Sequence, residues 1–111
     1  MTSTELYNLV RDVRRDAWPT FKQDHGADLS LTFLHDQWNL TTAVGQHIFG
    51  VPPSMVETLF VGSMAAEVVK RGGEITGMPA QVTIEDKEGQ LRYFTAPTLI
   101  EALAAALKEV Q

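Results

Sequence analysis

The sequence predicts a single α+β domain, residues 1–111, in which an antiparallel sheet of about four strands packs with three helices. Two stretches alternate polar and apolar residues on both sides of a short polar segment, which is the pattern of a β-hairpin. Three other stretches repeat apolar residues at the spacing of an amphipathic helix. Along the chain these segments follow the order α-ββ-α-ββ-α.

The composition limits the class of protein. Hydrophobic residues make up 44% and charged residues 21% of the chain, as in ordinary globular domains. The absence of cysteine excludes disulfides, thiolate metal ligands and thiol nucleophiles. The sequence shows neither a signal peptide nor an apolar run long enough to cross a bilayer, so we expect a cytoplasmic protein without membrane contact.

The net charge of −5 narrows the expected partners. Contacts with phosphates supply most of the affinity for nucleic acids, so we do not expect an acidic chain to bind them as its main role. A basic surface on another protein would complement this charge.

The first helix is predicted from its N-terminal cap. Thr2 and Glu5 have the spacing of a capping box, and apolar residues then follow the helical period. Because Pro19 disfavours helical geometry at Trp18, the helix should end near Trp18.

The first hairpin contains the stretch LTFLHDQWNL. Leu31 and Phe33 alternate before its polar segment, and the alternation resumes at Trp38. We predict an exposed turn at residues 35–37 rather than a catalytic cluster, because a His and an Asp adjacent in sequence do not orient each other as an acid–base pair. A short helical piece is expected at residues 45–49.

The second helix follows a Gly-Val-Pro-Pro break. Ser54 is its predicted N-cap, and it should run to Lys70 or Arg71 with Gly72 just beyond its end. Residues 73–79 then form a connector.

The second hairpin is predicted from strand-like runs at residues 81–85 and 91–95 around a turn at residues 86–89. Thr95 or Thr98 caps the last helix. The apolar stripe of this helix consists of Leu99, Ile100, Leu103, Leu107 and Val110.

The two halves share a spacing. Val82 follows Leu31 by 51 residues, and Ile84 follows Phe33 by the same interval. This indicates either a duplicated αββ unit or a chance likeness between two common units.

The second half of the chain, read as α-β-β-α, resembles the phage ABA-sandwich domains of small phage-encoded proteins. The hairpin VTIEDKEGQLRYFTA and the directly following APTLIEALAAAL carry the resemblance, which covers about half of the chain. It implies an α/β sandwich of phage or prophage origin and supplies no catalytic residues.

The second helix is apolar around nearly its whole circumference. Such a helix is either enclosed within the fold or shared with another chain. We expect it to form a homodimer interface. A partner helix could approach closely at Gly62, Ser63, Ala65 and Ala66, and the outward Ala102 and Ala105 of the last helix would add to the interface. The predicted interface residues are Met55, Leu59, Phe60, Val61, Met64 and Val68. The alternative is a central helix covered by the first hairpin.

A second candidate site lies on the first helix. Arg11, Arg15 and Trp18 cluster on one helical face and could hold an anion or an acidic partner. The alternative is a solvated face, in which Asp12 and Asp16 balance the basic residues.

A third candidate is a ligand pocket between sheet and helices, for which Trp38, His47 and Tyr93 would be the natural lining residues. No metal site is expected, because His25, His35 and His47 lack the spacing of metal ligands. The glycines of RGGEITGMP follow a helix instead of opening one, so we expect no phosphate loop and no cofactor.

These observations favour a non-catalytic protein–protein interaction module that forms a homodimer. An inhibitor or immunity-type adaptor for an unknown protein partner belongs to this class and would use the acidic charge. The alternative is a small-molecule-binding protein or minor enzyme with its site between sheet and helices.

Overall fold

A computed structural model describes residues 1–21, 28–42, 47–77 and 80–110, without the side chains of His47 and Phe49. The described elements are α1 (Ser3–Val10), the 3-10 helix η1 (Arg15–Ala17), β1 (Thr20–Phe21), β2 (Leu29–Leu34), β3 (Gln37–Thr42), β4 (His47–Val51), α2 (Pro53–Lys70), β5 (Glu74–Thr76), β6 (Ala80–Glu85), β7 (Leu91–Ala96) and α3 (Leu99–Val110). The α+β class and the three α-helices are confirmed.

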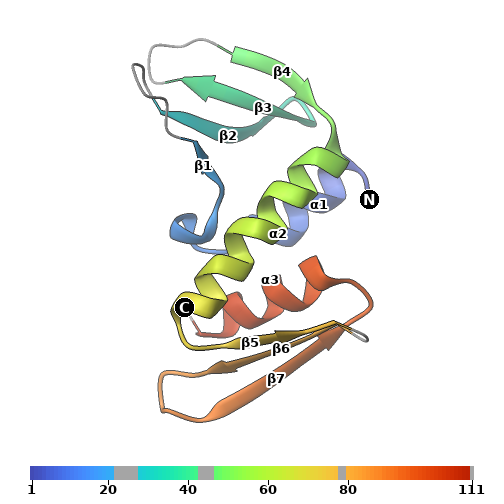
Figure 1. The fold of residues 1–111 in the computed structure, drawn as a ribbon. Coiled ribbons are helices and arrows are strands. Elements are labelled where there is room, and N and C mark those ends of the chain that lie inside the picture. Colours follow the sequence, from blue (N-terminus) through green and yellow to red (C-terminus); the bar gives the residue numbers. More distant parts are fainter. Residues whose placement is uncertain (22–27, 43–46, 78–79, 111) are drawn as a thin grey trace.

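The strands form two separate antiparallel sheets, and the prediction of one four-stranded sheet is therefore wrong. Strands β1-β2-β3-β4 form sheet A, and strands β5-β6-β7 form sheet B. The two sheets lie at opposite ends of an elongated molecule of 43 × 29 × 21 Å. Helix α2 runs from one sheet to the other, with α1 and α3 packed beside it (Figure 1).

Helix α1 begins as predicted and ends earlier. The backbone N–H of Glu5 donates to the Thr2 hydroxyl at 3.1 Å, and the Thr2 N–H donates to the Glu5 carboxylate at 3.0 Å, which completes the capping box. The helix stops at Val10 rather than near Trp18. The turn and the 3-10 helix η1 that follow bury both Val13 and Trp18, whose indole N–H donates to the Val13 carbonyl at 3.1 Å.

The predicted turn after Phe33 is confirmed at residues 35 and 36, whereas Gln37 already belongs to β3. Leu34 pairs with Gln37, so His35 and Asp36 form a two-residue loop. Both loop residues have positive φ, 54° and 59°, which is the geometry of a type I′ hairpin turn. Their side chains are exposed.

Trp38 anchors the core under sheet A. It pairs with Phe33 across the hairpin, is fully buried, and donates its indole N–H to the Ser3 carbonyl at 3.2 Å. Its ring lies 5.9 Å from that of Trp18 and 5.5 Å from that of Phe60. Aromatic contacts at these distances tie sheet A, the η1 segment and α2 together.

Three strands were not expected from the sequence: β1, β4 and β5. The helical piece predicted at residues 45–49 is wrong from residue 47 onward, where β4 lies; residues 45 and 46 lie outside the described residues. A bulge interrupts β4, and the buried Asn39 side chain accepts the Gly50 N–H at 3.2 Å there. Gly50 has a φ of 70°, which few other residues adopt.

Helix α2 starts two residues earlier than predicted. Pro52 occupies the N-cap position and Pro53 the first turn, so Ser54 is inside the helix. The predicted end is confirmed, because Gly72 adopts a φ of 77° beyond Lys70.

Sheet B and α3 follow the predicted pattern. In β6, Val82 and Ile84 are buried against α3, while Gln81 and Thr83 lie on the other face. Glu101 donates its backbone N–H to the Thr98 hydroxyl at 3.4 Å, so Thr98 is the cap. The predicted stripe faces inward, but so does Ala102, which is fully buried instead of outward; Ala105 is exposed.

The predicted 51-residue offset relates strand positions, since β2 starts at Leu29 and β6 at Ala80. The loops that follow differ in length, and the two strands belong to different sheets. A duplication therefore stays a prediction.

Candidate interaction surface on helix α2

Helix α2 has an inner face that belongs to the core. Val56, Phe60, Met64 and Val68 have no exposed side-chain surface. They recur every four residues and so form one row along the helix. This row joins the core under sheet A to the core between α3 and sheet B, because all four side chains belong to one cluster of buried residues.

The opposite row is exposed, and we call it the outer face of α2. Its exposed members are Met55, Thr58, Gly62, Ala66 and Val69, while Leu59 and Ala65 at its edges are half-buried and pack against the core. Met55 and Val69 are 55% and 62% exposed. No residue of this face carries a charge, whereas the outward side of a surface helix is normally rich in charged residues.

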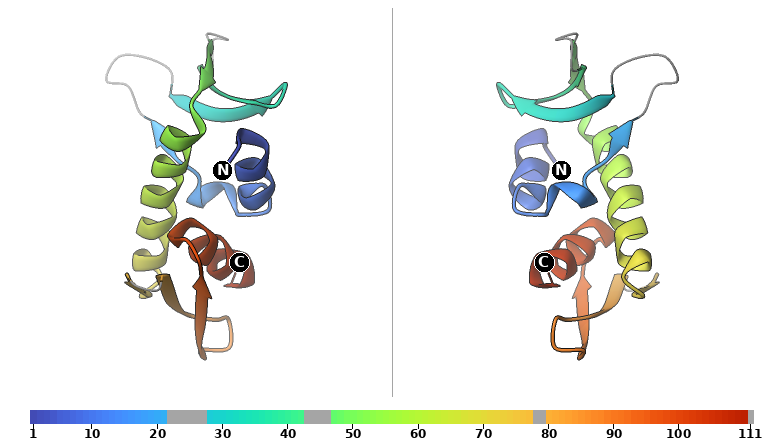
Figure 2. Two further views of the ribbon diagram at one scale, coloured as in Figure 1. Left: turned by 90° about the vertical axis from the view of Figure 1, so that its right-hand side faces the viewer. Right: turned by 90° about the vertical axis from the view of Figure 1, so that its left-hand side faces the viewer.

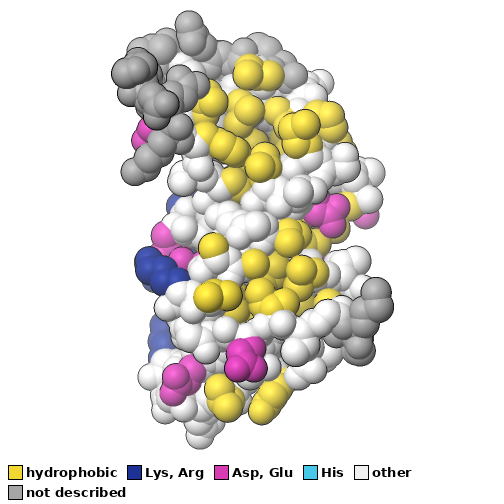
Figure 3. Space-filling model, in the orientation of Figure 1, with side chains coloured by type: hydrophobic (Ala, Val, Ile, Leu, Met, Phe, Trp, Pro, Cys, Tyr) yellow, Lys and Arg dark blue, Asp and Glu magenta, His cyan; other side chains and the backbone are white. Residues whose placement is uncertain are grey.

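No described element covers the outer face. Figure 2 shows α1 and α3 on one side of α2 and neither helix on its other side. Figure 3 shows hydrophobic side chains gathered over α2 on the exposed side of the molecule, with few charged side chains among them. Glu67, on the flank of the helix, is held by Arg71 at 3.0 Å.

Small residues occupy the middle of the outer face and larger ones its ends. Thr58, Gly62 and Ala66 are spaced by four, and a Cβ added to Gly62 would meet no atom within 4 Å. Met55 precedes Gly62 by two turns, and Val69 follows it by two turns. The surface is therefore shallow at its centre and raised at both ends.

The predicted interface residues divide between the two faces. Met55 is exposed, and Leu59 and Val61 are half-buried. Phe60, Met64 and Val68 are core residues of their own chain, so their assignment to an interface is corrected. The sequence prediction missed Thr58 and left Val69 out of the interface residues, although Ala66 was already expected to allow close approach. The four-residue spacing of small side chains is the signal that could have found Thr58.

Two of the three residues predicted on the first helix, Arg15 and Trp18, contact each other, and both lie beyond the end of α1. The Arg15 guanidinium lies 3.8 Å from the centre of the Trp18 ring, and Trp18 itself is buried. Arg11 pairs with Asp12 at 3.5 Å, and Arg14 pairs with Asp16 at 3.5 Å. Neighbouring carboxylates thus offset much of the positive charge.

The predicted ligand pocket does not come together in the structure. Trp38 is fully buried in sheet A, whereas Tyr93 lies on β7 of sheet B, at the other end of the molecule (Figure 1). His47 is in β4, paired with Thr41, and its side chain lies outside the described part of the structure.

The described residues contain no group of three or more metal-ligating side chains. His35 is in the exposed turn after β2, and His25 lies outside the described residues. Within the same described part of the chain, no helix is long and apolar enough to span a membrane.

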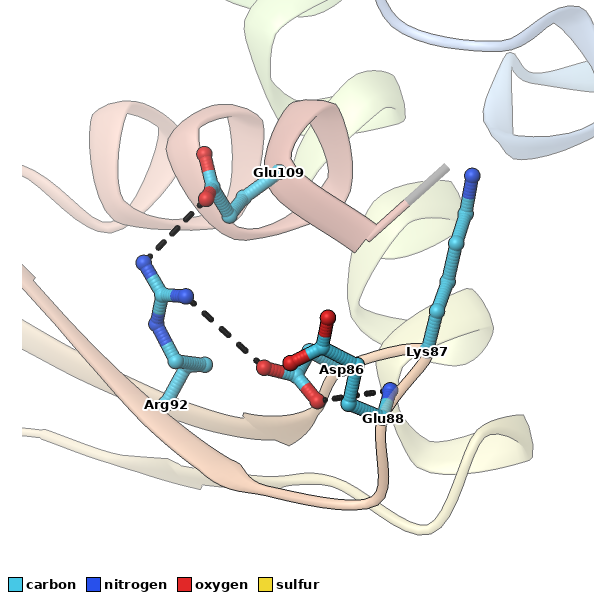
Figure 4. Close-up of a pocket in the computed structure, with 5 residues that line it drawn as sticks. All are labelled: Asp86, Lys87, Glu88, Arg92 and Glu109. Atoms are coloured by element: carbon cyan, nitrogen blue, oxygen red, sulfur yellow. Dashed lines mark hydrogen bonds and ion pairs between the residues drawn. The ribbon is translucent and has the colours of Figure 1, made fainter.

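A polar hollow at the tip of the second hairpin is built around an ion-pair network. Arg92 lies 3.1 Å from the Glu109 carboxylate and 3.7 Å from that of Asp86 (Figure 4). Asp86 also accepts the backbone N–H groups of Glu88 and Gln90, each at 2.9 Å. These contacts hold the hairpin tip against the end of α3, which is a structural role.

Comparison of the chain with protein-family models, with curated proteins and with solved structures gives no match. The resemblance of the second half to phage ABA-sandwich domains therefore stays a prediction.

Proposed function

We propose that this protein is a non-catalytic protein–protein interaction module that pairs with a second copy of itself through the outer face of α2. The observation that carries the proposal is the uncharged, exposed row on α2, which ends in the apolar side chains of Met55 and Val69. Exposed apolar surface of this kind marks interaction sites. Two-fold dimers are the commonest assemblies that use one such surface twice.

The outer face suits an antiparallel pair of helices with the two-fold axis at Gly62. Because Met55 and Val69 lie at equal distances from Gly62, Met55 of one chain would meet Val69 of the other. Thr58 would likewise meet Ala66. The small central residues let the two backbones approach closely, while the larger end residues close over the partner helix.

The size of this surface also predicts its strength. Helix α2 has 18 residues and is thus about 27 Å long. A standard stable interface buries about 800 Å² on each partner, which a single helix face supplies only in part. We therefore expect a reversible dimer that dissociates on dilution.

Engineered cysteines test the geometry directly, because the chain has no cysteine of its own. Gly62→Cys should form a disulfide-linked dimer under mild oxidation, since the two copies of this position meet on the axis. Met55→Cys and Val69→Cys should each cross-link poorly alone but readily when the two variants are mixed. Non-reducing electrophoresis measures each outcome. A parallel pair would instead link Met55→Cys to itself and overturn the proposed arrangement.

Light scattering over a range of concentrations tests the dimer without cross-linking. Val69→Lys should raise the dissociation constant at least about tenfold, because it buries a charge without a partner. Leu34→Lys is the matched control: Leu34 is 52% exposed and belongs to β2 rather than to the outer face of α2, and its change should leave the mass unaltered. A wild-type protein that stays monomeric throughout, or equal effects of both variants, would disprove the proposal.

A further inference from the structure

The edge of sheet B formed by β7 differs from the other sheet edges. An unpaired edge strand exposes N–H and C=O groups to any extended chain, and proteins usually shorten or distort such edges. Strand β1 has two residues and β5 has three, while β4 is interrupted by its bulge. Strand β7 has six residues, contains neither proline nor glycine, and pairs with β6 along its whole length.

The other side of β7 is open. Sheet B ends with β7, and no described strand pairs with its second edge (Figure 1). In an antiparallel pair, alternate residues direct their N–H and C=O groups to the partner strand. About half of the backbone groups of β7 therefore point to the free edge.

The sheet face beside this edge carries two exposed apolar side chains. Leu91 and Tyr93 are 61% and 64% exposed on the side of sheet B that faces away from α3. They line a shallow hollow together with Gly72, Glu74 and Thr83. Glu74, Thr83 and Tyr93 are cross-strand neighbours, so this hollow crosses the whole sheet.

The charged strand residues on this face of sheet B are all acidic. Glu74 and Glu85 lie on it, the latter opposite Leu91. Arg92 belongs to the other face, where Glu109 and Asp86 bind it. Among the described strand residues, the outer face of sheet B therefore has carboxylates and no cation.

We propose that β7 accepts, as an additional strand, an extended basic segment of another protein in which cationic and apolar side chains alternate. Backbone hydrogen bonds to the free edge would hold the segment, as in other cases of strand addition. Its Arg or Lys side chains would lie over the Tyr93 ring and reach toward Glu85, while its apolar residues would point to the α3 side. Strand β7 of a second copy fits this edge less well, because its one basic residue, Arg92, is already paired with Glu109 and Asp86 and offers this face no cation.

A synthetic peptide tests this site in the full-length protein. The probe is a fluorescein-labelled, end-capped nine-residue peptide that alternates Arg with Val, and fluorescence anisotropy measures its binding. A peptide with Glu in place of every Arg should bind at least about tenfold more weakly. Two further peptides are N-methylated on one or the other alternate set of residues. Strand addition requires that only one set abolish binding, because only one edge of the peptide strand pairs with β7.

Variants locate the peptide on the protein. Tyr93→Lys should weaken binding at least about tenfold, while Asn8→Lys, which adds the same charge on the exposed side of α1, should change it less than twofold. Circular dichroism confirms that both variants fold, as expected for exposed positions. Amide hydrogen exchange should slow in β7 when the peptide is bound.

Four results would overturn the proposal. The first is failure of the basic peptide to bind. The second is equal binding of both N-methylated peptides and the unmodified one, which would indicate attraction by charge alone. The third is an equal loss of peptide binding in Tyr93→Lys and Asn8→Lys. The fourth is stronger binding of a peptide copied from residues 91–96 than of the basic peptide, which would assign the edge to a second copy instead.

Discussion

The two faces of α2 are made from similar apolar residue types, but one face is buried and the other is exposed. The inner row, which contains Phe60 and Met64, has no exposed surface, whereas the outer row around Gly62 lies open. Both rows follow the helical period, with spacings of three or four residues, so periodicity does not distinguish them. Side-chain size does: larger residues fill the core that α2 shares with α1, η1 and α3, and small ones leave a shallow surface. A helix that is apolar all round can thus serve a core and an interface at once.

The largest expected effect comes from breaking the inner face. Phe60→Ala should lower the free energy of unfolding by about 3–5 kcal/mol, because it removes a buried ring that packs 4.9 Å from Trp18 and 5.5 Å from Trp38. Met55→Ala, on the outer face, should change it by less than about 0.5 kcal/mol in the dissociated chain. Urea denaturation at a concentration where light scattering shows single chains measures both. Similar losses in the two variants would contradict the division of α2 into two faces.

Replacing each of two glycines by alanine tests the same difference between a covered and an open surface. A Cβ on Gly73 would lie 2.7 Å from both a Val68 methyl carbon and the Thr83 carbonyl oxygen, so Gly73→Ala should cost about 1–3 kcal/mol. A Cβ on Gly62 would meet nothing within 4 Å. Because alanine favours helices, Gly62→Ala should stabilise the isolated chain by about 0.5–1 kcal/mol.

Both glycine variants are measured by urea denaturation in a Val69→Lys background, which keeps dimer formation from contributing. Opposite signs of the two changes are the expected outcome. Destabilisation by Gly62→Ala would mean that another part of the chain covers the outer face.

Local chemistry accounts for what the sequence could predict. The capping box of Thr2 and Glu5, the turn at His35 and the apolar stripe of α3 each depend on residues that are close in the sequence. The short strands β1 and β5 have too few residues to show a pattern, and they exist because a longer neighbour pairs with them. Helix α1 ends early for a similar reason, because burying Val13 and Trp18 outweighs a continued helix.

The candidate site was predicted only in part, for a long-range reason. The sequence shows that α2 is apolar on every side, but the packing of α1 and α3 decides which side is covered. Phe60, Met64 and Val68 were therefore grouped with Met55, although they lie on the opposite face. The sequence also could not show that the strands form two sheets, because one sheet and two sheets are equally compatible with the alternation within each hairpin.

The smallest expected effect concerns helix α1, which packs against the inner face of α2. Helix α1 packs beside α2 with Leu6 and Val10 fully buried, and its first turn depends on the capping box. The Thr2 backbone N–H and then the Thr2 hydroxyl hold the pKa of Glu5 below its ordinary value of 4.5. A carboxylate with a lowered pKa stabilises the fold above pH 4.5, and this contribution is lost as the pH falls through the lowered pKa.

Glu5→Gln keeps an acceptor in the capping box but removes the titration. The difference in the free energy of unfolding between wild type and this variant should therefore shrink as the pH is lowered from 7 to 3, with the change confined to the range below pH 4.5. Urea denaturation at a series of pH values measures it. The effect should be small because Glu5 is fully exposed. A difference that grows in acid would mean that the carboxylate does not stabilise α1, and that the cover of the inner face depends on burial of Leu6 and Val10 alone.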